Sequence, residues 1–170
     1  MVGVGASPRD ELARDAGLDI ENGIVVDEFL RTSAADVFAA GDVASTWNQL
    51  YKKRIRMEHW ANALNQGQAA ARNMLRQGTA YAKLPYFYSD QYDFGMEYNG
   101  FAADWDQVVV RGDAARREFL AFWLRDGHVL AGINANVWYH GDGIKALIRS
   151  DTAVNLDSLA DPSVPLSDLA

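Results

Sequence analysis

The run Val37-Phe38-Ala39-Ala40, followed directly by Gly41-Asp42-Val43, decides the fold class of this chain. Four consecutive apolar residues predict a short strand that is buried on both faces, as in a parallel sheet. A glycine at the end of such a strand lets a ligand approach the main chain, and the next side chain can accept hydrogen bonds from sugar-like hydroxyls. Gly41 and Asp42 are therefore candidate ligand contacts, although the tripeptide alone favours a simple turn in which Asp42 caps the next segment.

The segments on either side of this run predict an α/β domain. Residues 2–6 and the β-branched stretch 24–30 are predicted to be strands. Between them, a short helix is predicted from Pro8 to about Ala16, with Ser7 as its N-cap. Residues 59–75 give the clearest helix, because good helix formers recur along the whole segment.

The composition changes near residue 80, where aromatic residues begin to crowd the chain. The dipeptide Asp126-Gly127 is typical of a hairpin with a type I′ turn, and residues 141–150 predict a closing helix with one apolar face. We therefore divide the chain into residues 1–80, the end of an α/β nucleotide-binding domain, and residues 81–170, a small α+β domain with an antiparallel sheet. The strands predicted for the second part are 94–98, 107–111, 118–124 and 128–137.

Composition and charge exclude several classes of function. A formal net charge of −7 argues against nonspecific nucleic-acid binding. The absence of cysteine excludes disulfides and iron–sulfur ligation by this chain, and it fits a reducing cytoplasm. No apolar run approaches the roughly 20 residues that span a bilayer, and no signal peptide opens the chain. We expect no metal site, because His59, His128 and His140 match no common zinc spacing.

A second candidate site lies where the clearest helix begins, at Glu58-His59-Trp60-Ala61-Asn62. The first N–H groups of a helix have no partner within the helix, and they carry a partial positive charge. They suit an anionic or carbonyl-rich ligand edge, such as the pyrimidine end of a reduced flavin. The alternative is that Glu58 offsets the helix dipole while His59 and Trp60 pack on a neighbouring sheet, and the sequence does not decide between the two.

The aromatic stretch from Pro85 to Tyr92 also has two interpretations. It contains Tyr86, Phe87 and Tyr88, which can cover a planar cofactor at the edge of a domain. The same residues can simply fill a core, and their spacing alone favours the core.

Taken in order, these segments resemble a known family. Three of them resemble the return segment of the FAD domain in two-dinucleotide-binding flavoprotein reductases. Two more narrow the resemblance to FAD-dependent NAD(P)H:ferredoxin reductases that serve oxygenases and cytochromes P450, in the pyridine nucleotide-disulfide oxidoreductase superfamily. The segments that resemble the return segment of the FAD domain are Val4–Pro8, Gly23–Asp27 and Val37–Ala44. The segments that narrow the resemblance to ferredoxin reductases are Glu58–Ala63 with Gln66-Gly67, and Phe87–Asp93.

The resemblance implies a role for each matching position. Asp42, in the Gly41-Asp42-Val43 element, would bond the ribityl chain of FAD, and Gly41 would give access to it. The pyrimidine edge of the flavin would lie at His59, Trp60 and Ala61. Tyr88 stands where many relatives have tryptophan beside the flavin ring.

The resemblance also implies a function for the parent protein, which is electron transfer from NAD(P)H through FAD to a ferredoxin. The glycine-rich FAD motif and the NAD(P)-binding domain of the family are not in this chain, so we expect the chain alone to be inactive. A basic cluster, defined as Lys52, Lys53, Arg54 and Arg56, is a candidate docking site for an acidic ferredoxin, although a solvated loop explains it more simply. The alternatives are a stand-alone interaction domain without flavin, or a nitrite- or rubredoxin-linked reductase of the same superfamily.

Overall fold

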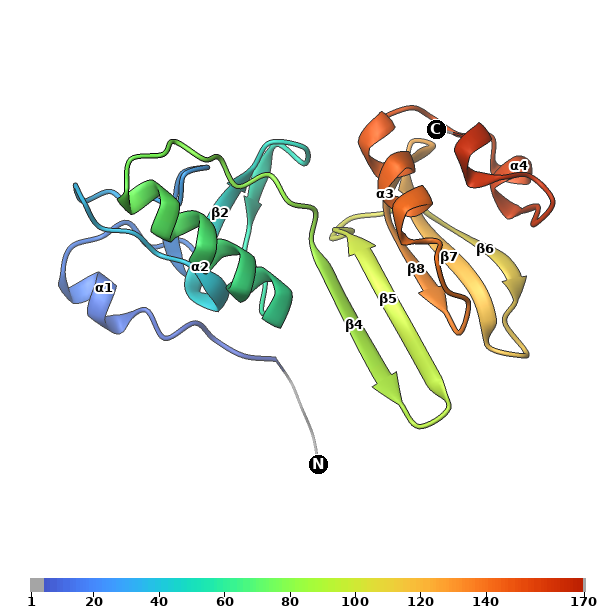
Figure 1. The fold of residues 1–170 in the computed structure, drawn as a ribbon, viewed down its shortest axis with the longest axis horizontal. Coiled ribbons are helices and arrows are strands. Elements are labelled where there is room, and N and C mark those ends of the chain that lie inside the picture. Colours follow the sequence, from blue (N-terminus) through green and yellow to red (C-terminus); the bar gives the residue numbers. More distant parts are fainter. Residues whose placement is uncertain (1–4, 170) are drawn as a thin grey trace. The chain divides into compact units, whose positions relative to one another are not determined.

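The computed structural model describes residues 5–169, and Figure 1 shows its fold. The chain divides into two compact units between Lys83 and Leu84. Within residues 5–169, the first unit has a three-stranded sheet and the second a five-stranded sheet. The predicted fold class is confirmed, because an α/β part precedes an antiparallel sheet. In the predicted strand 2–6, residues 2–4 lie outside the described part of the chain, and residues 5 and 6 belong to no strand.

The first unit is a small mixed sheet covered by one long helix. Its longest helix matches the predicted helix 59–75 to within one residue at each end. The core gathers Val26, Leu30 and Ala44 from the sheet side against Ala69 and Ala70 of the helix. The elements of this unit are α1 (Glu11–Asp15), β1 (Ile24–Val26), the 3-10 helix η1 (Gly41–Val43), β2 (Ala44–Asn48), β3 (Lys53–Ile55) and α2 (Trp60–Met74).

Several boundaries in the first unit differ from the prediction. The helix α1 begins at Glu11 rather than Pro8, and its N-cap is Asp10 rather than Ser7. The strand β1 is shorter than the predicted 24–30, because a turn follows in which Leu30 has a φ of 65°. The sequence predicts no strand at β2 or β3. These short strands pair with each other and with β1, and such pairing is not visible in local sequence.

The prediction of a buried strand at residues 37–40 is wrong in this structure. Among residues 5–169, the segment makes a single bridge, between Arg31 and Phe38. Its apolar side chains pack at the edge of the core without joining the sheet. A strand needs a hydrogen-bonding neighbour along its length, and the described residues place no strand beside this segment. Val37 is exposed and residues 38–40 are only half-buried, so both the ladder and the predicted full burial are absent.

The second unit is built on a five-stranded antiparallel sheet of order β4-β5-β8-β7-β6. The four predicted strands and the predicted helix 141–150 are confirmed, and the aromatic stretch forms a fifth strand, β4, that was not predicted. Asp126 and Gly127 both have positive φ, at 50° and 78°, as the predicted hairpin turn requires. The elements are β4 (Tyr86–Gln91), β5 (Phe94–Gly100), β6 (Gln107–Asp113), β7 (Glu118–Arg125), β8 (His128–Ala135), α3 (Gly141–Ser150), α4 (Leu156–Ala160) and the 3-10 helix η2 (Leu166–Asp168).

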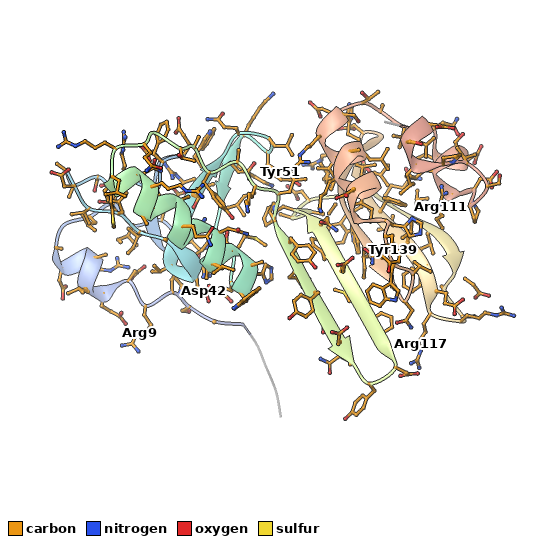
Figure 2. All side chains as sticks on the ribbon, in the orientation of Figure 1. Arg9, Asp42, Tyr51, Arg111, Arg117 and Tyr139 are labelled. Carbon is orange, nitrogen blue, oxygen red and sulfur yellow. The ribbon has the colours of Figure 1, made fainter. Side chains whose placement is uncertain are left out.

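Helix α3 packs closely on the sheet, and an arginine holds the C-terminal segment. A Cβ added at Gly132 would lie 2.7 Å from Cγ2 of Ile144, so only glycine lets α3 approach β8 this closely. The guanidinium of Arg111, on β6 in Figure 2, is buried and donates to the carbonyl groups of Leu159, Pro162 and Val164. The tail beyond α3 is therefore part of the folded unit.

Candidate functional site

The Gly41-Asp42-Val43 turn forms η1 and is held from the interior by helix α2. The Gly41 N–H donates to Oε1 of Gln66 at 2.8 Å. Gly41 has a φ of 80°, and a Cβ there would lie 3.4 Å from Cβ of Ala63. A glycine is therefore required here by backbone conformation, while Asp42 itself is exposed (Figure 2).

Arg56 holds the same turn from the other side. Its Nη1 donates to the main-chain oxygen of Asp42 at 3.0 Å and to Oε1 of Glu58 at 2.7 Å, and its Nε donates to Asn22. The side chain is only 11% exposed. These bonds reach the main chain of Asp42 and leave its carboxylate directed to solvent, which is the arrangement a hydroxyl-bearing ligand needs.

The N-terminus of α2 lies beside this turn. His59 is the N-cap, but its side chain makes no capping bond, and the first turn contains no acidic residue. Burial lowers the pKa of His59, although the Asp42 and Glu58 carboxylates oppose this effect. The lowered pKa favours the neutral imidazole, and the N–H groups of the first turn add their partial positive charge to that of Arg56.

The residues predicted for this edge differ in exposure. Trp60 is 73% exposed, His59 is half-buried, and Ala61 is half-buried. Trp60 does not pack on a neighbouring sheet, so that part of the alternative interpretation is wrong. The structure thus brings Gly41, Asp42 and Val43 together with the start of α2.

A cavity of about 280 Å³ opens beside Asp42. One wall is the extended segment 6–9, and Asp42, Val43, Arg56 and Glu58 form the other. In Figure 2, Arg9 and Asp42 mark this side of the unit. The lining is largely apolar and also holds arginine donors and carboxylate acceptors, so the cavity can take a ligand with both apolar and polar groups.

Tyr88 lies in the second unit, in the middle of β4. It pairs with Glu97 across the β4–β5 ladder and is 58% exposed. Its neighbour Phe87, which points to the opposite face, stacks on Tyr98 with ring centroids 5.0 Å apart. The core role that spacing favoured therefore belongs to Phe87, while Tyr88 presents an open aromatic face.

A larger cavity, of about 500 Å³, lies in the second unit near the start of α3. Here the Tyr86 hydroxyl donates to Oε1 of Glu97 at 2.9 Å, and burial together with this bond raises the pKa of Tyr86 to about 12. Oε2 of the same carboxylate accepts from the Asn134 side chain. The buried amide of Asn99 makes no hydrogen bond to protein among residues 5–169. Local sequence does not reveal this polar group, because its members are far apart along the chain.

The basic cluster is only partly available for docking. Arg54 donates through Nη1 to the carbonyl groups of Val26 and Ser45, and Arg56 is occupied at the η1 turn. These bonds give the two arginines a structural role at the sheet and the turn, and docking at the cluster stays a prediction. Of the two lysines, Lys52 is exposed and Lys53 is half-buried at the start of β3.

The sequence analysis assigned no role to Gln66 or to the turn-holding function of Arg56. A signal for Gln66 was present, because Asn62, Gln66 and Asn73 recur at helical spacing on one face of a predicted helix. Among residues 5–169, no group of three or more acidic, histidine or cysteine side chains could hold a metal ion. The described helices include none with the length and apolar character needed to cross a membrane.

Comparisons with known proteins match both units. The family described as reductase C-terminal matches residues 86–170, and the pyridine nucleotide-disulphide oxidoreductase family matches residues 1–67. The ferredoxin–NAD(+) reductase component of the anthranilate 1,2-dioxygenase system of Burkholderia cepacia is 41% identical over 167 residues, which are 98% of this chain and 41% of that protein. Putidaredoxin reductase of Pseudomonas putida is 35% identical over 169 residues, which are 99% of this chain and 40% of that protein.

The fold agrees with a solved structure of the same kind. The crystal structure of the covalent putidaredoxin reductase–putidaredoxin complex superposes with a TM-score of 0.88 at 36% identity, and covers 98% of this chain and 40% of that chain. The present chain therefore spans about two fifths of the length of the relatives it matches. Since the reductase C-terminal family accounts for half of the sequence, this chain belongs to that family and corresponds to the C-terminal portion of ferredoxin reductases.

Proposed function

We propose that this chain supplies part of the FAD site and the C-terminal domain of a reductase that passes electrons from NAD(P)H through FAD to a ferredoxin. In this proposal residues 1–80 are the C-terminal part of the FAD-binding domain, and residues 81–170 are the reductase C-terminal domain. A reducing cytoplasm is the compartment that suits a cysteine-free redox protein. The relatives named above are ferredoxin and putidaredoxin reductases, which supports this class of activity.

The observation that carries the proposal is the meeting of η1 with the start of α2 beside a cavity. Asp42 is exposed at this place, with its main chain fixed by Gln66 and Arg56. A fixed carboxylate can accept hydrogen bonds from the ribityl hydroxyls of FAD. The uncapped N–H groups at the start of α2 can face the carbonyl-rich pyrimidine edge of the flavin.

The residues present fit FAD in chemistry as well as in place. When bound, FAD would supply the redox chemistry that links NAD(P)H to an iron–sulfur protein. The protein has to bind, orient and shield this group. Asp42 orients the ribityl chain, Gly41 allows close approach, and His59, Trp60 and Ala61 line the pyrimidine edge. Tyr88, with its open aromatic face, is proposed to lie against the flavin ring.

The test of this site is Asp42→Ala in a chimera in which residues 1–170 replace the matching segment of the Pseudomonas putida putidaredoxin reductase. Loss of a charge-assisted hydrogen bond costs about 1.5–3 kcal/mol, so the Kd for FAD should rise by about one to two decades. The matched control is Asp15→Ala, which removes an exposed carboxylate at the end of α1. Equal flavin content in the Asp42→Ala variant and the parent after extensive dialysis contradicts the assignment.

The partner is proposed to be an acidic ferredoxin that docks at the basic cluster, in which Lys52 is exposed and Lys53 begins β3. Complementary charge raises association rates at low ionic strength. In the same chimera, reversing both lysines to glutamate should raise the KM for ferredoxin while NAD(P)H oxidation by a small dye stays unchanged. Reversal of Arg116 and Arg117, which lie in the turn between β6 and β7, is the control for net charge. Identical ferredoxin kinetics at low salt would remove these lysines from the docking surface.

A further inference from the structure

The face of helix α2 that is buried in the first unit is unusually polar. Three of its five buried residues are amides, namely Asn62, Gln66 and Asn73. Each binds another segment: Asn62 donates to the Met57 carbonyl, and Asn73 donates to the carbonyl groups of Phe29 and Thr79. Burying an amide side chain stabilises the fold less than burying a leucine does. The hydrogen bonds of this face therefore serve to hold the loops in place.

Gln66 is the member of this face that reaches the proposed FAD site. It is 2% exposed, and both ends of its amide have partners. Oε1 accepts from the Gly41 N–H at 2.8 Å, and Nε2 donates to the Thr46 hydroxyl at 3.0 Å. The side chain therefore ties together the residue before Asp42 and the middle of β2, and both bonds are buried.

The bond to Gly41 fixes the direction of Asp42. Ala40 is extended, with φ −147° and ψ 157°, and Gly41 changes to φ 80°, so the chain turns sharply at the peptide whose N–H binds Gln66. Beyond this turn, Arg56 holds only the carbonyl of Asp42. Without Gln66, the Gly41 N–H would be buried and unpaired, and the glycine would be free to adopt other conformations.

We propose that Gln66 is the positioning residue of the FAD site, acting through the Gly41 N–H to hold Asp42 in its ligand-binding orientation. This inference rests on the proposed FAD function. Gln66 does not contact FAD. It lowers the free energy that is needed to fix the conformation of the turn when FAD binds. The effect should appear in flavin affinity and flavin spectrum, and not only in the stability of the fold.

The first test uses the chain of residues 1–170 without FAD. Hydrogen exchange measured by NMR should show the Gly41 amide to be protected, and Gln66→Leu should remove this protection. Thr46→Val removes only the second partner of Gln66 and should leave the Gly41 amide protected. The control is Gln68→Leu, the same change at an exposed position of the same helix. Exchange of the Gly41 amide in the unmodified chain at the rate of an open amide overturns the proposal without any variant.

The second test uses the FAD-loaded chimera described above. Gln66→Leu should raise the Kd for FAD about tenfold and shift the visible absorption of the bound flavin, while Gln68→Leu leaves both unchanged. If Gln66→Leu does not fold, as judged by circular dichroism, Gln66→Asn takes its place, because its amide is one methylene too short to reach Gly41. An unchanged Kd in a folded Gln66 variant overturns the proposal. So does an equal loss of affinity in Thr46→Val, since that result indicates general packing.

The outcomes separate this inference from the function on which it rests. If Asp42→Ala has no effect on FAD retention, the site itself is wrong. If Asp42→Ala weakens FAD binding and Gln66→Leu does not, only the positioning role fails.

Discussion

The two units of this chain are held together by different means. In the second unit the strands are six to eight residues long, and each pairs with its neighbours along most of its length. Its core is mostly apolar, with Phe122, Leu124, Ile144 and Leu147 almost completely buried. Three polar side chains, Asn99, Asn134 and Arg111, are buried there as well. In the first unit the strands have three, five and three residues. There, buried amides and two arginines bind the main chain of the loops.

The difference shows which contacts stabilise each unit. An antiparallel sheet with an apolar core folds from local hairpins and needs few special contacts. A sharp turn such as η1 has one main-chain conformation, and side-chain bonds from α2 and Arg56 hold it. The first unit is therefore sensitive to single polar contacts, and the second is sensitive to core volume.

The largest expected effect comes from expressing the two units separately, which tests whether they differ in stability. Residues 84–170 expressed alone should give one cooperative unfolding transition, because the sheet and α3 form a closed core. Residues 1–83 alone should unfold at a lower temperature and over a broader range, because three short strands and one helix bury little large apolar surface. Calorimetry of the two fragments measures this directly. A sharp transition in residues 1–83 would show that its polar contacts suffice for stability.

The second expected effect concerns core volume. Phe122 is fully buried in the middle of β7, so Phe122→Ala should lower the free energy of unfolding by about 3–5 kcal/mol. Val108→Ala, at a 44% exposed position of the neighbouring strand β6, should change it by less than about 0.5 kcal/mol. Urea unfolding of the whole chain, followed for the second unit, gives both values. Similar losses in the two variants would mean that the apolar core does not dominate this unit.

The third expected effect tests the amide face of α2. The Asn73 side chain donates to Phe29 and Thr79 and accepts from the Thr79 N–H at 2.7 Å. Asn73→Ala leaves these buried groups unpaired and should cost about 2 kcal/mol. Asn65→Ala, which removes only an exposed bond to Lys83, should cost about 0.5 kcal/mol or less. Hydrogen exchange of α2 reports the difference, and equal protection in both variants would argue against a structural role for the buried amides.

The smallest expected effect depends on pH. Burial raises the pKa of Tyr81 to about 12, and its hydroxyl donates to Oδ1 of Asn62. The neutral phenol is favoured in the fold, so its contribution to stability is complete below pH 10 and is lost as the pH rises from 10 to 12. Tyr81→Phe should remove this pH-dependent contribution and lower the free energy of unfolding by about 1 kcal/mol at neutral pH. Parallel stability curves for the variant and the parent between pH 10 and 12 would show that Tyr81 does not titrate in this way.

Much of the second unit and part of the site could be predicted from local sequence. Helix 141–150, the Asp126-Gly127 turn and four strands are specified by periodicity and turn chemistry within each segment. The Gly41-Asp42 turn and the start of α2 are likewise visible, because glycine and helix-start signals are local. Tyr88 was identified through the family resemblance, since spacing alone favours a core role.

Other features required the tertiary structure. The run Val37–Ala40 is apolar enough for a strand, but a strand exists only where a neighbour completes its hydrogen bonds, and local sequence does not reveal neighbours. The same reason explains why β2 and β3 were missed: their pairing joins residues that are not hydrophobic in alternation. Arg54 and Arg56 looked like surface charge, yet both bind main-chain carbonyls.

By itself, then, the sequence determined the types of the longer elements, the break near residue 80 and the residues at the turn beside α2. Only the tertiary structure decided which side chains hold that turn. Gln66 and Gly41 are 25 positions apart, and their bond depends on how α2 packs. Periodicity reports which face of a helix is buried, because burial follows from a repeat within the segment. It does not show which residues that face contacts, because contacts between distant segments are fixed by the packing of the whole unit.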